Sequence, residues 1–160
     1  MKYKILNNNI LQKDATKLYR IQALKSFSDV KEGDIGGFVQ GENNLSQFGN
    51  CWIYDYAEVS GYASVEDNAI VRDAVIQGTS IIGLNGLVQS TKDYLYIRGI
   101  GSKNRATTAY KTKDNIMIVC GCFIGTLNEF KSRVHETHGG TDYEKEYNAL
   151  IDIIKIHFNI

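Results

Sequence analysis

The chain contains no proline, only three cysteines and no excess of either charge. Without proline, tight turns must use glycine, asparagine and aspartate, which reach positive φ readily. The cysteines, Cys51, Cys120 and Cys122, are odd in number and sparse, so no disulfide framework is expected. Eighteen basic residues balance eighteen acidic ones. That balance excludes a generally basic nucleic-acid coat and an acidic DNA mimic.

Long apolar runs are also lacking. No stretch approaches the roughly 20 residues that a membrane-spanning helix needs. The first residues, Met-Lys-Tyr-Lys-Ile-Leu-Asn-Asn, lack the apolar core of a signal peptide. We therefore expect a protein of the bacterial cytoplasm that has reduced thiols and no membrane association.

A six-residue period marks the middle of the chain. Aliphatic residues recur at Ile53, Val59, Val65 and Val71, followed four places later by Ala57, Ala63, Ala69 and Val75. The same frame extends backwards through Cys51, Leu45 and Val39 to Ile35, and forwards to Ile81 and Leu87. This period predicts a short left-handed parallel β-helix of hexapeptide repeats, with about three coils. The alternative, an ordinary alternating sheet, would not keep a six-residue phase for so long.

The predicted fold is mostly β, in three domains. Residues 1–34 form an N-terminal β cap, residues 35–90 the left-handed β-helix, and residues 91–160 a small α+β domain. In the last domain, apolar runs at 94–100, 106–111 and 116–123 predict an antiparallel meander.

Two helices should follow the meander. Each begins at a capping box, Thr126 with Glu129 and Thr141 with Glu144, and the first ends at Gly139-Gly140. Their apolar stripes have the spacing of a buried helix face, so we assign them to the core.

Basic side chains concentrate between residues 92 and 113, a segment that contains six basic residues and a single acidic one, Asp93. Interleaved hydroxyl, amide and aromatic side chains would suit a phosphate and a stacked base. The expected ligand-binding residues are Arg98, Ser102, Asn104, Arg105, Thr107, Tyr110, His135 and His138. The alternative is a solvated hairpin whose lysines only keep it soluble.

The cysteine and histidine residues of the C-terminal half could also suggest a metal site. Two thiols and two imidazoles, Cys120, Cys122, His135 and His138, are a chemically sensible zinc set. The cysteines are only one residue apart, however, and strand alternation would place both on one buried apolar face. We therefore expect structural cysteines and no metal, and keep the four-residue site as the weaker alternative.

The central repeats contain no histidine. Acyltransferases of the hexapeptide type commonly use a histidine base, whereas the three histidines here are His135, His138 and His157. Acyl transfer is therefore disfavoured, and neither a catalytic residue nor a cofactor is expected.

Several motifs resemble those of phage and prophage hexapeptide-repeat proteins without an assigned function. Between residues 1 and 88 these are Tyr3-Lys-Ile-Leu, Leu18-Tyr-Arg-Ile-Gln-Ala-Leu, Gly36-Gly-Phe-Val, Asn44-Leu-Ser and Gly49-Asn-Cys-Trp-Ile-Tyr-Asp. The run Cys120-Gly-Cys-Phe-Ile-Gly-Thr-Leu-Asn-Glu-Phe, with Glu136-Thr-His-Gly and Glu146-Tyr, resembles a C-terminal α+β module of such proteins. The resemblance implies a viral accessory protein that acts against host immunity.

The resulting hypothesis is a phage counter-defence sponge. It would bind and sequester a small anionic, nucleotide-derived immune signal without chemistry, in the cytoplasm of an infected bacterium. Two alternatives remain open: a protein–protein inhibitor of a host defence component, and a hexapeptide-type acyl- or acetyltransferase. We also expect a homo-oligomer, most simply a trimer, joined through the outward faces of Trp52, Tyr54, Tyr56 and Tyr62.

Overall fold

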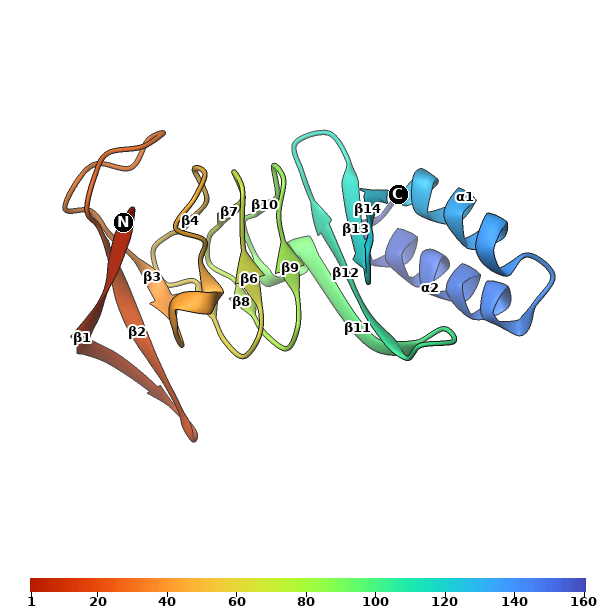
Figure 1. Ribbon diagram of the computed structural model, residues 1–160, viewed down its shortest axis with the longest axis horizontal. Helices are drawn as coiled ribbons and strands as arrows, with labels where there is room; N and C mark the ends of the chain where they lie inside the picture. Colours follow the sequence, from red (N-terminus) through yellow and green to blue (C-terminus); the bar gives the residue numbers. More distant parts are fainter. The chain divides into compact units, whose positions relative to one another are not determined.

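The structure is a computed structural model that describes all residues, Met1–Ile160, and divides into two compact units, Met1–Thr91 and Lys92–Ile160 (Figure 1). The chain is mostly β, with several small sheets, two short 3₁₀ turns (Glu42–Asn44 and Thr91–Asp93) and two α-helices. Neither helix combines the length and the apolar character that a membrane crossing requires.

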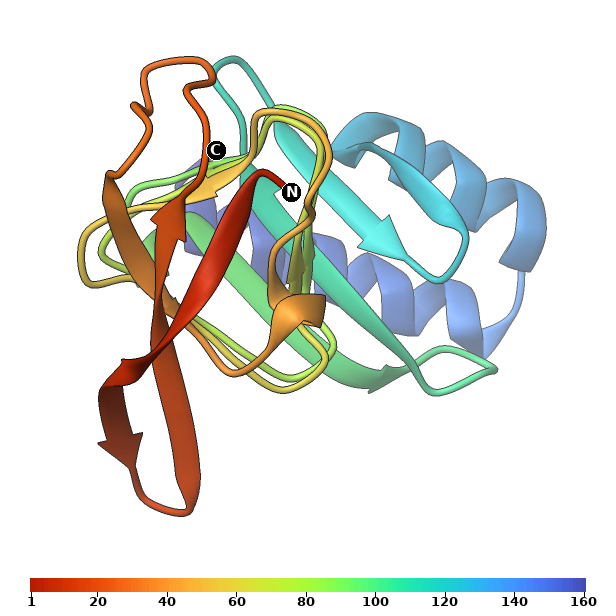
Figure 2. The ribbon, with the colours of Figure 1, turned by 60° about the vertical axis from the view of Figure 1, so that its left-hand side comes forward.

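The first unit begins with a long antiparallel hairpin, seen well in Figure 2. Strand β1 (Tyr3–Lys13) pairs with β2 (Thr16–Ala23) across a turn at Asp14, whose φ is 51°. The pairing register shifts between Leu6 and Ile10, which bulges the intervening asparagines out of the ladder. Strand β3 (Ile35–Val39) continues the sheet antiparallel to β2.

Seven strands of two residues each follow β3. They are β4 (Trp52–Ile53), β5 (Glu58–Val59), β6 (Ser64–Val65), β7 (Ile70–Val71), β8 (Val75–Ile76), β9 (Ile81–Ile82) and β10 (Leu87–Val88). Strands β5 and β8 extend the first sheet in parallel, giving the order β1-β2-β3-β5-β8. The others form two separate parallel sheets, β10-β7-β4 and β6-β9.

The predicted regular left-handed β-helix is wrong, because this region consists of several small mixed and parallel sheets. The six-residue phase that supported the prediction does not persist. After Val71 the next fully buried aliphatic residue is Ile76, one position early, and the shifted frame continues through Ile82 and Val88. The inward positions that we predicted at Ile81 and Leu87 are partly exposed instead.

The first positions of the predicted frame also deviate. Ile35, expected to point inward, is 48% exposed. Trp52, expected on an outward face, is 1% exposed and packs edge-on against Tyr3 and Phe27. The isoleucine therefore lies outside the core, and the tryptophan within it.

The second unit contains a four-stranded antiparallel sheet of β11 (Tyr94–Ile100), β12 (Arg105–Lys111), β13 (Ile116–Cys120) and β14 (Phe123–Thr126). The sequence predicts only three strands here, with the run 116–123 as a single strand. The chain instead reverses at Gly121, whose φ is 61°, and Cys120 pairs with Phe123 across a two-residue loop.

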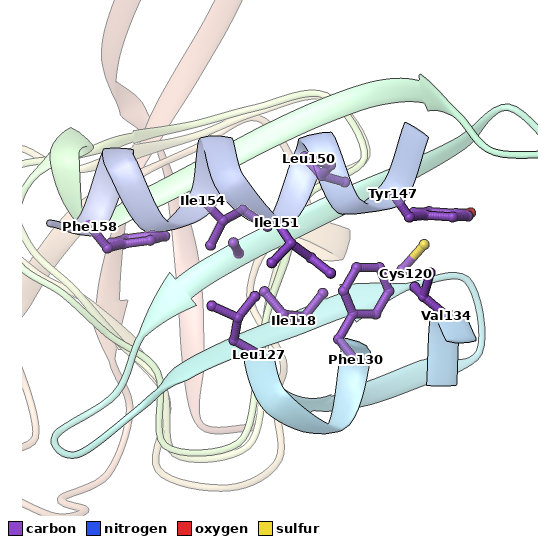
Figure 3. Packing of buried hydrophobic residues seen from close by; sticks show 11 residues of the cluster. Ile118, Cys120, Leu127, Phe130, Val134, Tyr147, Leu150, Ile151, Ile154 and Phe158 are labelled. Atoms are coloured by element: carbon purple, nitrogen blue, oxygen red, sulfur yellow. The ribbon is translucent and has the colours of Figure 1, made fainter. Parts of the chain in front are cut away.

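Both predicted helices are confirmed, as α1 (Leu127–His138) and α2 (Asp142–Phe158). In the cap of α1, the Glu129 carboxylate accepts hydrogen bonds from the amide and hydroxyl of Thr126, at 2.7 and 2.8 Å. The apolar stripes of the two helices pack together with β13, as Figure 3 shows for residues such as Ile118, Phe130 and Ile154. This shared core fixes the positions of the strand ends and helix faces that line the cavity described below.

Candidate functional site

A cavity of about 330 Å³ lies within the second unit. It is bounded by the loop between β11 and β12, the start of β12, the turn between β13 and β14, and one face each of α1 and α2. Its apolar side consists of Cys120, Phe123, Phe130, Val134 and Tyr147, and its polar side of Ser102, Lys103, Arg105, Cys122, Arg133, Thr137 and His138. No carboxylate is among the lining residues.

Aromatic contacts shape the apolar side. The Phe130 ring lies 5.3 Å from Phe123 and 5.7 Å from Tyr147, centroid to centroid. The His138 imidazole stacks on Tyr147 at 5.5 Å, with 24° between the ring planes. Offset ring packing of this kind is favourable beyond the burial of area alone. It gives the cavity a firm aromatic wall.

Two glycines allow the loops to approach this wall. Gly101 has a φ of 73°, and a Cβ added there would lie 2.2 Å from the Tyr147 hydroxyl. The backbone amide of Gly101 donates a hydrogen bond to the Glu146 carboxylate at 2.8 Å. At Gly121 a Cβ would collide with the Arg105 guanidinium at 1.7 Å. Arg105 therefore lies across the Gly121 turn, where any larger residue would displace it.

The two neighbouring cysteines lie in different surroundings. Cys120 is 7% exposed, and its sulfur accepts a hydrogen bond from the Thr107 hydroxyl at 3.2 Å. Figure 3 shows this sulfur directed toward Tyr147. Cys122 is exposed. The prediction that both share a buried face is wrong, because the chain turns between them at Gly121 and ends the strand alternation.

Burial raises the pKa of Tyr147 to about 12. Cys120 contributes to this raised pKa through its electrostatic interaction and hydrogen bond with the phenol, whereas the nearby Arg105 cation opposes the shift. The phenol is therefore neutral over the physiological range, and it serves the cavity as a hydrogen-bonding and stacking group.

The structure brings three of the eight predicted ligand residues to the cavity, namely Ser102, Arg105 and His138. Thr107 is buried and contributes indirectly, through its bond to Cys120. Lys103, one of the six bases between residues 92 and 113, also lines the cavity. The basic loop thus meets the end of α1 as a single site.

The other four predicted residues lie elsewhere. Arg98 is exposed on β11, and Asn104 holds the tip of the β11–β12 loop with a φ of 47°. Tyr110 is fully buried in the sheet. His135 lies 2.7 Å from the Glu144 carboxylate, to which it is hydrogen-bonded. This hydrogen bond is the main cause of the lowered pKa of the Glu144 carboxyl, and the hydrogen bond from the Gly140 amide is the second.

The metal alternative gains no support from the geometry. No group of three or more histidine, cysteine, aspartate or glutamate side chains is arranged to hold a metal ion. Of the four candidates, Cys120 is buried in the core while His135 pairs with Glu144 on the surface.

Sequence reasoning missed Arg133, Thr137 and the aromatic wall. A signal was present, since Arg133 and Thr137 are four residues apart and therefore share a helix face next to the buried stripe of Phe130 and Val134. What no local pattern shows is that this face meets the β11–β12 loop.

A second cavity, of about 340 Å³, includes Lys111 and Lys113. Lys111 is already paired with the Asp93 carboxylate, at 2.7 Å. In the cavity around Arg105, Arg133 is paired too, with Glu136 at 3.5 Å, so that Lys103 and Arg105 carry the positive charge of that cavity.

No protein-family model matches the chain. Over 75 residues the chain is 40% identical to a protein of Escherichia coli (strain K12) named "Uncharacterized acetyltransferase YdcK". The aligned part is 44% of this chain and 22% of that protein. The chain thus spans about a fifth of the length of this relative, and is similar to an acetyltransferase over that part.

Proposed function

We propose that the cavity binds a nucleotide-derived anion, and that this anion is an acyl thioester of coenzyme A from which the protein transfers an acetyl group. The observation that carries the proposal is the lining itself: Lys103, Arg105 and Arg133 on one side, an aromatic wall on the other, and no carboxylate. This combination suits a ligand that has both phosphates and an apolar or aromatic part.

The cationic side suits phosphate. Arg105 can bind two phosphate oxygens at once, because the guanidinium presents paired donors in one plane. The second arginine of the lining, Arg133, is paired with the Glu136 carboxylate at 3.5 Å. Arg105 is held over the Gly121 turn, so part of its ordering cost is met before the ligand arrives.

The aromatic side suits a ring or an apolar arm. Phe123, Phe130 and the stacked pair His138–Tyr147 offer ring faces and edges. A volume of about 330 Å³ is near the lower end of ligand pockets, which span roughly 300–1,000 Å³. It would therefore hold part of a coenzyme-sized molecule and leave the rest on the surface.

The choice of an acetyl donor is supported by the partial likeness to an acetyltransferase. In such a reaction an acceptor amine or hydroxyl attacks the thioester carbonyl carbon, the carbon–sulfur bond breaks, and the coenzyme leaves as a thiol. His138, the one imidazole in the lining, would act as the general base toward the acceptor.

A second candidate function is sequestration of an intact nucleotide-derived signal. It is favoured by the absence of histidine from the unit Met1–Thr91, which leaves that unit without the usual base for acyl transfer. Binding would use the same cavity, and the ligand would be recovered unchanged.

Thermal unfolding with coenzyme A and acetyl-coenzyme A tests the proposal. A ligand present at 100 times its Kd should add about 2.7 kcal/mol of stability. Arg105→Ala should weaken binding about tenfold or more, since hydrogen bonds to charged groups contribute about 1.5–3 kcal/mol. Arg98→Ala is the matched control, because this arginine lies outside the cavity lining.

The fate of the ligand separates the two candidates. Release of free coenzyme thiol with an amine acceptor present supports transfer, whereas quantitative recovery of acetyl-coenzyme A after denaturation supports sequestration. No thermal shift with any nucleotide would refute both.

A further inference from the structure

Strand β14 lies at one edge of the sheet in the second unit, and a further cavity lies beside it. The strand order β11-β12-β13-β14 gives β14 a hydrogen-bonded neighbour on one side only. The cavity, of about 550 Å³, is lined by Phe123 and Ile124 of β14 and by side chains of α1, among them Asn128, Ser132 and Glu136. A strand edge and a helix face therefore border the same cavity, which we call the β14 cavity.

The pairing register of β14 directs the backbone of Ile124 to the open side. Cys120 pairs with Phe123 across the two-residue loop, and Val119 pairs with Ile124. The residues that close such a hairpin exchange backbone hydrogen bonds, and in an antiparallel ladder bonded pairs alternate with pairs that exchange none. The amide and carbonyl of Ile124 therefore point away from β13, where a further strand could pair with them.

The next backbone amide on the open side is already bonded, which limits the open edge. The amide of Thr126 donates to the Glu129 carboxylate at 2.7 Å, as expected for a residue whose backbone faces away from β13. Ile124 keeps its outward amide and carbonyl, and its side chain is 56% exposed. An added strand would thus gain one pair of main-chain hydrogen bonds here, together with contacts to the cavity.

The β14 cavity is continuous with the coenzyme cavity of about 330 Å³ and has little free charge of its own. Cys122, Phe123 and Arg133 line both cavities. Arg133 is paired with Glu136 at 3.5 Å, and Glu129 is engaged in the cap of α1. Because these are the charged side chains of the lining, the β14 cavity favours recognition of a main chain over that of a highly charged small molecule.

We infer that the acceptor of the acetyl group is an extended peptide, which pairs with β14 at Ile124 and presents a lysine to the coenzyme thioester. This inference rests on the proposed function and names the class of its acceptor. Peptides that add to a sheet edge gain main-chain hydrogen bonds, and neighbouring pockets select their side chains. Lysine fits because its apolar stem can pack on Phe123, which lines both cavities, while its amine extends to the donor.

The transfer step balances without a further reagent. The neutral lysine nitrogen bonds to the thioester carbonyl carbon, the carbon–sulfur bond breaks, and the coenzyme leaves as a thiolate. The proton lost by the amine passes through His138 to this thiolate. The products are an acetylated lysine and a free coenzyme thiol.

Steady-state acetyl transfer by the full chain to matched acceptors tests the inference. The probe is a capped heptapeptide of alternating valine and threonine with lysine at its centre. Its KM should be lower than that of Nα-acetyl-lysine amide by about tenfold or more, as two main-chain hydrogen bonds would give, with a similar kcat. Methylation of the peptide's backbone nitrogens keeps the side chains but removes the main-chain donors, and should abolish this advantage.

Ile124→Pro tests the strand edge from the side of the protein. Proline removes the outward amide and is tolerated on edge strands, whereas the matched control, Ile124→Ala, keeps the amide. Only the proline variant should raise the KM of the peptide to that of the lysine amide. Both should still bind the coenzyme, because Ile124 lies outside the lining of the coenzyme cavity. If the proline variant does not fold, Ser132→Trp fills the β14 cavity from α1, with Lys131→Trp, outside that lining, as its control.

The outcomes separate this inference from the proposed function. Coenzyme binding and transfer with equal KM values for the lysine amide, the peptide and the methylated peptide would overturn the inference and leave the proposed function intact. A dimer that Ile124→Pro converts to a monomer would assign the edge to a second copy of the chain, and would also overturn it. Absence of coenzyme binding by the unmodified chain would overturn both.

Discussion

At the scale of residues, the first unit contains a buried polar side chain with every hydrogen-bonding group in use. Asn44 is fully buried, and its amide nitrogen donates to the carbonyls of Ala63 and Gly61 at 2.8 and 3.1 Å. Its side-chain oxygen accepts from the amides of Gln40 and Gly41 at 3.0 and 2.9 Å. One side chain thus bonds to the backbone of two neighbouring segments.

Asn44→Ala should lower the free energy of unfolding by about 3 kcal/mol, because it leaves buried backbone groups without partners. Urea unfolding measures the change. The matched control is Asn43→Ala, which removes an exposed neighbour with one bond to Gly61. Equal effects for the two variants would contradict this account of Asn44.

The raised pKa of Tyr147 predicts a pH dependence in the site. The folded chain keeps the phenolic proton up to about pH 12, whereas the unfolded chain loses it near the ordinary value of 10.0. The folded state therefore binds more protons between these values, and its stability should fall as pH rises through that window. Below pH 10 this contribution is fully present.

Difference absorbance between the unmodified chain and Tyr147→Phe isolates this phenol from the other tyrosines. The account expects phenolate formation near pH 12 rather than 10, and a weaker alkaline loss of stability in the variant. Ionisation at the ordinary value would show that the phenol is not buried as described.

At the scale of elements, local patterns predicted the helices better than the strands. The capping box at Thr126 and the glycines after His138 mark the ends of α1, because orphan backbone groups need nearby partners. Strand β14 was missed, since nothing in the run 116–123 distinguishes a turn at Gly121 from an extended residue. Part of the site was predictable, because the basic segment pointed to Arg105. The contact between that segment and α1 depends on tertiary packing, which no local sequence pattern shows.

The corrected register of the short strands predicts losses of stability of different size for two adjacent isoleucines. Ile82 is fully buried, whereas Ile81 is partly exposed. Ile82→Ala should cost about 2–5 kcal/mol of unfolding free energy, as for other core truncations. Ile81→Ala should cost roughly 1 kcal/mol, typical of a less buried site. If chemical denaturation showed a larger loss for Ile81→Ala than for Ile82→Ala, the original prediction, in which Ile81 points inward, would be right.

The N-terminal cap of α1 can be tested in the same way. Thr126→Ala removes the hydroxyl that accepts from the Glu129 amide at 3.3 Å, and should cost about 1 kcal/mol. Thr126→Ser keeps the hydroxyl and should retain most of the stability. If both variants melt with the unmodified chain, the cap does not stabilise the helix.

At the scale of the whole molecule, the expected homotrimer stays a prediction. Tyr56 and Tyr62 are 74% and 83% exposed, whereas Trp52, assigned to the same interface, is buried in the core. Sedimentation equilibrium should give three times the mass of the chain, and Tyr56→Ser with Tyr62→Ser should shift it toward a monomer. A monomer at every concentration would contradict the expectation.

The central claim is that a cation-lined cavity in Lys92–Ile160 binds a coenzyme-type anion. Calorimetric titration of acetyl-coenzyme A into the full chain tests this claim most directly. The account predicts one saturable site that weakens with added salt, is lost in a variant with Arg105→Ala and Arg133→Ala together, and is kept by Arg98→Ala. Absence of saturable binding, or equal binding by all three proteins, would contradict it.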